Sequence, residues 1–409
     1  VIFGRYVGAG LTRTEAIDCP VGTRAKHCQP PVVSGHGGYT YGDFPLIGGA
    51  PEVHASGEVW SQTLWDLRSA LGHRVADMLI TRGMSLSPNE PSMPDMRNAI
   101  IQADRAVYGG RHVKRIWQVF AHRGMGFFAG SLTSGDPNTV ESFRLPPGHG
   151  APRGTVRGRV IDRLTKRPIK NALVEIAGHR SGLLPNYADR TNAQGRYAIH
   201  RVVAAKYPGI IAFARGYHTI SRTIRVRHSG TKEDFKPRRD WAATNGGGRI
   251  TRFTGPDFAG FGCGPSDAID LSPFSGWGST AGDDAGTPTN VIVPKHIVVR
   301  LSATVTVSSF NVDPTATCGD PGSASTGAFR IATSANGTAW TKAVQGTFTT
   351  ADQGRFNLVK PAAPIPGVRF VRFTMAGTQV PDFSHNCPNG PYAGCTFMDM
   401  SELEVYGTR

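Results

Sequence analysis

The stretch PEVHASGEVWSQTLWDLRSALG, Pro51 to Gly72, decides the fold of the N-terminal part of the chain. Its apolar side chains recur at helical spacing and predict a helix with one core-facing stripe. The stripe consists of Trp60, Leu64, Leu67 and Leu71. His54 and Glu58 stand one helical turn apart ahead of the stripe and therefore share one side of the helix. The pair belongs to a metal site, to half of a catalytic site, or to an ordinary helix that carries a histidine.

A metal site made by this pair alone is disfavoured by the number of ligands. Zinc requires at least three protein ligands. The zinc-peptidase motif His-Glu-x-x-His is absent from the 409 residues. The nearby histidines show no diagnostic spacing: His27, His36 and His73. We therefore predict no zinc ligand in this chain.

The helical pattern continues to about Gly126. Ser92 is predicted to cap a helix that ends at Gly109 and Gly110. The apolar face of this helix is predicted to consist of Met96, Ala99, Ile100, Ala103 and Val107. A further helix is predicted to start near Val113 and to stop at Gly124.

The apolar pattern changes its period to two after the helices. Strands alternate with turn residues between Thr155 and about Val226, which predicts a small β-sandwich. Strands recur from about Arg249 to the end, which predicts a second sandwich of jelly-roll type. The predicted fold class is therefore multidomain α+β, a helical lobe followed by two β-sandwiches.

The net charge of +15 is concentrated in the middle of the chain. Residues 151–250 contain 21 Lys and Arg against 6 Asp and Glu, and the rest of the chain is balanced. A basic module can hold nucleic acid, an acidic polymer or a cell surface. Its charges do not alternate with aromatic residues as a single-strand binder requires, so a solvated basic surface without nucleic acid is favoured. No run of about 20 apolar residues exists, so no membrane span is predicted.

The six cysteines favour an oxidising compartment. Their positions favour the pairs Cys19 with Cys28, Cys387 with Cys395 and Cys263 with Cys318. Zinc would require closer clustering than these spacings provide. Disulfides imply an extracellular protein, and six reduced cysteines are the alternative.

Residues 39–130 resemble the C-terminal helical lobe of the fungalysin family, which are secreted, thermolysin-like zinc endopeptidases. The matching motifs are EVHASGEVW (52–60), RGMSLSP (82–88), RNAIIQAD (97–104) and IWQVFAHRGMG (116–126). In that family a zinc-activated water attacks the peptide carbonyl, and the histidine of the first motif donates a hydrogen bond to the developing oxyanion. The resemblance therefore implies a catalytic role for His54, none for Glu58, and zinc as the cofactor of the full-length protein.

The zinc ligands and general base of the family lie N-terminal to this lobe, and Val1 is expected to begin after them. The resemblance thus implies two partners, a protein or peptide substrate and the missing N-terminal part of the catalytic domain. The chain alone is expected to have no peptidase activity. The alternative is a non-catalytic extracellular protein that binds glycans or a surface and is built on a remnant peptidase lobe.

Two further resemblances cover the β regions. Residues 154–178 and the motif TNAQGRYAI (191–199) are similar to carboxypeptidase-regulatory-like modules, which are seven-stranded prealbumin-like sandwiches. The segments RFVRFTMAG (369–377) and FMDMSELEVYG (397–407) are similar to discoidin-like sandwiches of the coagulation-factor type C, which have a galactose-binding-like fold. Such modules often dock on glycans or surfaces. Calcium is a further candidate cofactor, since Asp283 and Asp284 lie between glycines, although a turn is favoured there.

The predicted domains follow these resemblances. Residues 1–130 are predicted to be the peptidase lobe, 153–229 the regulatory-like sandwich and 249–409 the discoidin-like sandwich. Residues 131–152 and 230–248 are predicted to be linkers. The two β modules are expected to direct the enzyme to a glycan or a cell-surface polymer.

Overall fold

A computed structural model describes residues 14–28, 37–44, 46–47, 53–88, 91–132, 136, 138–180, 187–272 and 274–409, without the side chains of residues 53–55. The chain divides into two compact units. Unit 1 consists of residues 1–161, 167–213 and 220–235, and unit 2 of residues 162–166, 214–219 and 236–409. None of the described helices is both long and apolar enough to span a bilayer. The domain boundaries expected from the sequence stay predictions.

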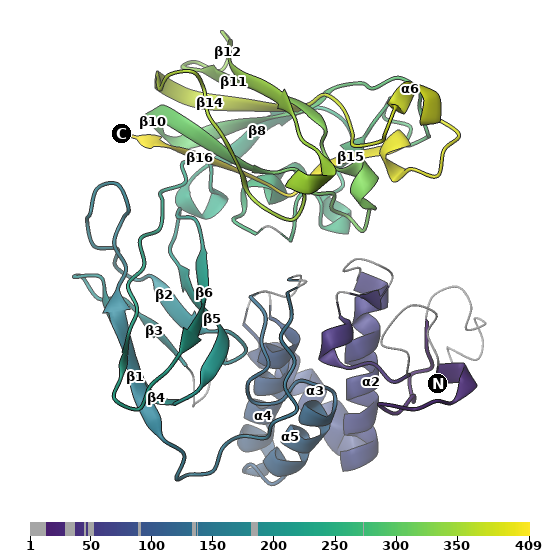
Figure 1. The fold of residues 1–409 in the computed structure, drawn as a ribbon, viewed down its shortest axis with the longest axis vertical. Coiled ribbons are helices and arrows are strands. Elements are labelled where there is room, and N and C mark those ends of the chain that lie inside the picture. The colour runs from purple at the N-terminus through teal and green to yellow at the C-terminus, as the bar shows by residue number, and fades with distance from the viewer. Residues whose placement is uncertain are drawn as a thin grey trace. The chain divides into compact units, whose positions relative to one another are not determined.

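Unit 1 begins with a lobe of α-helices (Figure 1). They are α2 (Val53–Leu71), α3 (His73–Leu86), α4 (Met93–Tyr108) and α5 (Val113–His122), preceded by the 3-10 helices η1 (Lys26–Cys28) and η2 (Tyr41–Asp43). The predicted stripe of α2 faces the core, where Leu67 is fully buried and Trp60 and Leu64 pack against it. Gly72, with a φ of 79°, separates α2 from α3.

Helix α4 starts and ends where the sequence predicts. The Ser92 hydroxyl accepts the Asp95 amide at 3.3 Å, and Asp95 Oδ2 accepts the Ser92 amide at 3.1 Å. Gly109 ends the helix in the left-handed region with a φ of 64°. One predicted member of the apolar face is wrong. Val107 is 43% exposed, because burial along α4 ends at Asp104, almost one turn earlier.

The second part of unit 1 is a β-sandwich whose described strands form two sheets, β4-β1-β7 and β3-β2-β5-β6. The strands are β1 (Arg153–Arg159), β2 (Leu173–Ile176), β3 (Ala188–Arg190), β4 (Arg196–Val203), β5 (Lys206–Phe213), β6 (Ile220–Arg225) and β7 (Thr231–Lys232). Strand β7 pairs in parallel with β1, whereas the other pairs are antiparallel. This is the strand number that the resemblance predicted for the module.

A buried arginine joins the helical lobe to this sandwich. Arg97 of α4 donates hydrogen bonds to the carbonyl oxygens of Met125 and Gly126, both at 2.7 Å. It also donates to the Gly178 carbonyl of the sandwich at 2.9 Å. Gly178 has a φ of 75°, and a Cβ there would lie 2.1 Å from the Ala129 carbonyl oxygen. The two parts therefore approach so closely that residue 178 has to be glycine.

Unit 2 is built on a seven-stranded sheet around the long strand β10 (Lys295–Asp313). The sheet has the order β12-β11-β14-β10-β13, and β8 and β16 also pair with β10. Strand β8 pairs with residues 297–300 of β10, while β13 and β16 pair with residues 306–313. Register shifts between Arg300 and Val307 bend β10, so that it has different neighbours on the two sides of the bend.

The other elements of unit 2 complete the sandwich. They are β8 (Arg249–Phe253), β9 (Trp277–Thr280), β11 (Ala328–Ser334), β12 (Thr341–Thr347), β13 (Asn357–Val359), β14 (Ile365–Met375), α6 (Phe383–Asn386), β15 (Phe397–Met400) and β16 (Glu402–Thr408). The core is apolar around Trp277, Phe310 and Phe373. The structure confirms the predicted fold class, a helical lobe followed by two β-sandwiches.

The disulfides confirm the predicted pairing. They are Cys19–Cys28, Cys263–Cys318 and Cys387–Cys395, and no described cysteine is free. The first lies in the helical lobe, and the other two lie in unit 2.

Candidate functional site

His54 lies in the first turn of α2. Its side chain is outside the described residues, so its predicted catalytic role stays a prediction. The structure does describe how the next two turns of α2 are held. These contacts fix the helix from which His54 projects.

Glu58 is buried one turn after His54, and donors from a neighbouring segment surround its carboxylate. Glu58 Oε1 accepts the Thr14 amide at 2.8 Å. Its Oε2 accepts the Thr14 hydroxyl and the Glu15 amide, both at 3.1 Å. Three donors already use the carboxylate, so Glu58 anchors residues 14–15 to α2. The interpretation that gave it no catalytic role stays a prediction.

Gln62 provides a second anchor one turn further on. Its side-chain oxygen accepts the Tyr39 amide at 2.8 Å, and its nitrogen donates to Glu15 Oε2 at 2.9 Å. Burial raises the pKa of Glu15, and the hydrogen bond from Gln62 opposes this rise. The amide side chain thereby holds residues 15 and 39 against the same helix.

Arg123 directly follows α5, is fully buried, and contacts Gln62. It donates to Gln62 Oε1 and Asp66 Oδ2, both at 2.7 Å. It also donates to the carbonyl oxygens of Cys19 at 2.7 Å and Tyr39 at 2.9 Å. Arg123 belongs to the motif IWQVFAHRGMG, so part of that motif holds the lobe together. The sequence reasoning missed this role because the acceptors lie far away in the chain.

The described residues do not fit a zinc site. The one group of metal-binding type among them is Cys19, His27 and Cys28. The two sulfur atoms are bonded to each other, so neither is available as a thiolate ligand. We therefore derive no step through zinc from the residues of this chain.

The acidic pair weighed for calcium forms a turn. Asp283 Oδ1 accepts the Ala285 amide at 3.1 Å, and Asp284 pairs with Lys295 Nζ at 2.7 Å. Asp284 therefore already has a cationic partner, which agrees with the favoured interpretation.

A different pair of carboxyl groups, the partly buried Asp270 and the fully buried Glu402, interacts in unit 2. Glu402 Oε2 accepts the Leu271 amide at 3.0 Å, and Oε1 is buried with no other donor among the described residues. The side chains of Asp270 and Glu402 share a hydrogen bond when one of the two carboxyl groups is protonated. Burial, and then the charge of Asp270, raise the pKa of Glu402 well above its usual value. Burial raises the pKa of Asp270 to about 6. Two neighbouring carboxylates repel each other when both are charged. The pair therefore either keeps a proton or binds a cation.

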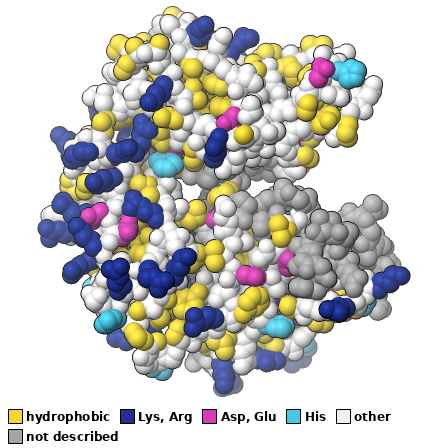
Figure 2. Space-filling model, in the orientation of Figure 1, with side chains coloured by type: hydrophobic (Ala, Val, Ile, Leu, Met, Phe, Trp, Pro, Cys, Tyr) yellow, Lys and Arg dark blue, Asp and Glu magenta, His cyan; other side chains and the backbone are white. Residues whose placement is uncertain are grey.

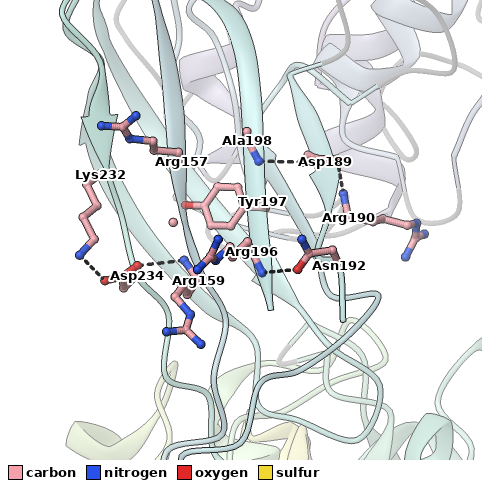
Figure 3. Close-up of a pocket in the computed structure, with 11 residues that line it drawn as sticks. Arg157, Arg159, Asp189, Arg190, Asn192, Arg196, Tyr197, Ala198, Lys232 and Asp234 are labelled. Atoms are coloured by element: carbon pink, nitrogen blue, oxygen red, sulfur yellow. Dashed lines mark hydrogen bonds and ion pairs between the residues drawn. The ribbon is translucent and has the colours of Figure 1, made fainter. Parts of the chain in front are cut away.

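The first sandwich carries most of the excess positive charge of the chain, and Lys and Arg side chains gather over it (Figure 2). Several line a hollow of about 480 Å³ formed by β1, β3, β4 and β7 (Figure 3). These basic residues are Arg157, Arg159, Arg190, Arg196 and Lys232. The alternation of Arg157 and Arg159 along one strand was the visible sequence signal of this face.

Backbone amides engage the two acidic residues of this hollow. Asp189 Oδ2 accepts the Ala198 amide at 2.7 Å, and Asp234 Oδ1 accepts the Arg159 amide at 2.9 Å (Figure 3). Asp234 also pairs with Lys232 at 3.1 Å, a surface contact of small energetic value. The hollow therefore stays positively charged.

Two segments of the chain match family models. Residues 36–129 match the model of the fungalysin metallopeptidases (M36). Residues 155–235 match the model of the carboxypeptidase regulatory-like domain. The first segment includes α2 to α5, and the second coincides with the first sandwich. Both resemblances predicted from the sequence are confirmed.

A curated relative is extracellular metalloproteinase 3 of Trichophyton tonsurans. It is 35% identical over 126 residues, which are 26% of this chain and 19% of the relative. The chain thus spans about a fifth of the length of the curated relatives that it matches.

Two solved structures are similar to part of the chain. One is CBM32-3 from a family 31 glycoside hydrolase of Clostridium perfringens, with 17% identity and a TM-score of 0.30, covering 39% of this chain and 91% of that one. The other is a fragment of a chitobiase-like protein of Bacteroides thetaiotaomicron, with 18% identity and a TM-score of 0.32, covering 40% of this chain and 90% of that one.

Proposed function

We propose that this chain is the C-terminal portion of an extracellular zinc metalloendopeptidase, and that its helical lobe forms one wall of the peptide-cleaving site. The match of residues 36–129 to the metallopeptidase model carries the proposal. The disulfides support an extracellular location. Zinc and its ligands are supplied by the rest of the catalytic domain. The two β modules direct the enzyme to a polymeric or surface-bound protein substrate.

His54 donates a hydrogen bond to the oxyanion that develops on the peptide carbonyl. A donor positioned for a developing charge contributes roughly 10²–10³-fold in rate, provided that it is held in place before the reaction. The anchoring of α2 by Glu58 and Gln62 supports such preorganisation. Glu58 thereby positions the helix and does not touch the substrate.

The test uses the protein produced from its complete reading frame. We expect stoichiometric zinc by mass spectrometry and hydrolysis of casein. His54→Ala should lower kcat by roughly 10²–10³-fold and change KM little, because the contact forms mainly in the transition state. His73→Ala, at an exposed position of α3, is the matched control and should leave both constants unchanged. Equal kcat in the His54 variant and the parent protein would refute this role.

The second candidate is a non-catalytic protein that binds a glycan or a surface through its β modules. The two β modules, which make up most of the described chain, favour it. A complete product without zinc and without casein hydrolysis would support this candidate and reject the peptidase.

We also propose calcium as a structural cofactor of unit 2, held by Asp270 and Glu402. The neighbouring carboxyl groups of Asp270 and the fully buried Glu402 support this, since carboxylate oxygens are the ligands that calcium prefers. Ser275 Oγ donates to Asp270 Oδ2 at 2.7 Å and orients that carboxyl group. A cation would replace the proton that the pair otherwise has to share.

A further inference from the structure

Several strands of the large sheet of unit 2 carry basic side chains and no acidic ones, whereas β15 and β16 contain Asp399, Glu402 and Glu404. Residues 249–409 contain 11 Lys and Arg against 12 Asp and Glu, so this part of the chain is nearly neutral. Strands β8, β11, β12 and β14 nevertheless contain no acidic residue, and β10 contains only Asp313 at its end. Positive charge therefore gathers on the part of the sheet formed by β8, β11, β12 and β14.

The register of the sheet brings several polar side chains onto one face. Arg330 of β11 lies opposite Gln345 of β12 on one side and Thr374 of β14 on the other. Thr374 in turn lies opposite His296 of β10. A row of polar side chains thus crosses four strands.

A second row lies one pleat away on the same face. Arg372, two residues before Thr374, lies opposite Ala332, and Ala332 lies opposite Lys342 of β12. Residues two apart in a strand point to the same face of a sheet. We call the surface formed by His296, Arg330, Lys342 and Arg372 the basic sheet face.

The basic sheet face is hollowed and has an aromatic wall. Its four residues line a hollow of about 870 Å³ together with Trp340. The Arg372 guanidinium lies 4.7 Å from the centre of the Trp340 ring, which orients both side chains. Trp340 is partly exposed, whereas the other aromatic residue of the lining, Phe329, is 5% exposed and belongs to the core.

The cations of this face lack counter-charges among the residues that the structure describes. No described acidic side chain forms an ion pair with Arg330, Lys342 or Arg372, although acidic residues are as numerous as basic ones in this part of the chain. Like charges on neighbouring strands repel one another and destabilise a sheet. Burial and then Arg372 lower the pKa of His296, which agrees with a positive potential in the hollow. An anionic ligand would relieve this repulsion.

We infer that the basic sheet face binds an anionic polysaccharide, a polymer of sugars that carry carboxylate or sulfate groups. The guanidinium groups of Arg330 and Arg372 match such anions in bidentate geometry, and Lys342 adds a point charge. Trp340 offers an apolar wall for a sugar ring. This names a ligand for the targeting half of the proposed function, on which it rests, and it does not depend on the peptidase half.

Two other anionic partners fit the hollow less well. Single-stranded nucleic acid is bound by successive aromatic platforms, and the hollow has one exposed aromatic residue. Anionic membranes are bound by charges combined with apolar side chains that insert into the lipid. None of the large exposed apolar side chains described for the chain lines this hollow.

The test is calorimetric titration of the whole chain with polygalacturonate, dextran sulfate and uncharged dextran. We expect binding to at least one charged polymer and none to dextran, and the two charged polymers distinguish carboxylate from sulfate as the recognised group. Arg330→Gln and Arg372→Gln should each raise Kd about tenfold, because a hydrogen bond to a charged group contributes about as much. Trp340→Ala should also raise Kd, because it removes the apolar wall for the sugar ring. Arg157→Gln, in the hollow of the first sandwich, removes the same charge elsewhere and should change Kd less than about twofold if binding is local.

Equal weakening by the Arg157 and Arg330 variants would overturn the inference, because it would indicate attraction to total charge alone. Tighter binding of single-stranded DNA or of phosphatidylserine vesicles than of either charged polysaccharide would overturn it as well. Arg330 is exposed, so its variant tests the face even if a substitution at Arg372 or Trp340 disturbs folding. Zinc and casein hydrolysis do not enter the titration, so failure here leaves the peptidase proposal standing.

Discussion

Arginine residues have opposite surroundings in the two units. In unit 1, Arg97 and Arg123 are completely buried and donate hydrogen bonds to several backbone carbonyl groups. In unit 2, Arg330 is exposed, Arg372 is partly buried, and neither forms an ion pair with a described carboxylate. The same side chain therefore serves the architecture of one unit and remains available to a ligand in the other.

The difference follows from what replaces water around each charge. A buried charge is costly unless hydrogen-bond partners compensate for the lost solvent. Burial lowers the pKa of Arg97 to about 9, which still leaves the group protonated at neutral pH. An exposed arginine keeps its water and contributes little to folding. We expect substitutions to affect stability in the first case and binding in the second.

Arg123→Met should have the largest effect on stability. It leaves the carboxylate of Asp66 and the carbonyl groups of Cys19 and Tyr39 without their donor. We expect a loss of about 3–5 kcal/mol in the free energy of unfolding of unit 1, measured by urea denaturation with hydrogen exchange to locate the change. Arg123→Lys keeps the positive charge but lacks the several fixed N–H donors of the guanidinium, so this variant should lose nearly as much stability. A loss below about 1 kcal/mol in both variants would contradict the comparison.

The stability of unit 1 should also fall in acid because of His179. Burial, and to a smaller extent the charge of Arg97, lower the pKa of His179 to about 3. The ordinary pKa is 6.5, so between pH 6.5 and 3 the unfolded chain binds a proton that the folded chain does not. The free energy of unfolding should therefore decrease by up to about 1.4 kcal/mol for each pH unit below 6.5.

His179→Asn should flatten this dependence, whatever its effect on stability at neutral pH. The matched control is His200→Asn, at an exposed position of β4, which should leave the slope unchanged. An identical slope in the His179 variant and the parent chain would show that other groups cause the acid sensitivity.

Calcium should stabilise unit 2 and leave unit 1 unaffected. A ligand at 100 times its Kd adds about 2.7 kcal/mol to the free energy of unfolding. Calorimetric scans with calcium and with a chelator measure this shift, and Glu402→Gln should abolish it. A shift that persists in the Glu402 variant would place the calcium elsewhere.

Arg330→Gln should have the smallest effect on folding. The side chain is exposed among like charges, so its removal should change the free energy of unfolding of unit 2 by less than about 0.5 kcal/mol. Thermal denaturation of this variant beside Arg123→Met tests the comparison directly. A loss as large as that of Arg123→Met would mean that the basic sheet face is structural.

Much of the fold could be predicted because its signals are local. The stripe of α2, the Ser92 cap and the Gly109 terminus depend on residues within a few positions of one another. The prediction that Val107 faces the core was wrong, because the extent of burial along α4 is set by the helices packed against it.

The sites were harder to predict because they join distant parts of the chain. The partner of Arg97 at Gly178, the pairing of Asp270 with Glu402, and the opposition of Arg330 and Thr374 all depend on tertiary pairing or register. No spacing in the sequence reveals them. His54 was singled out by its motif, and its role stays a prediction.

The bond from Arg97 to the Gly178 carbonyl decides how this protein can be divided and recombined. A chain cut in the predicted linker at residues 131–152 would separate a buried guanidinium from one of its acceptors. The surface around Ala129, which fits against a glycine, would also be uncovered. The lobe and the first sandwich should therefore be transplanted together, and chimaeras that exchange only one of them should express poorly.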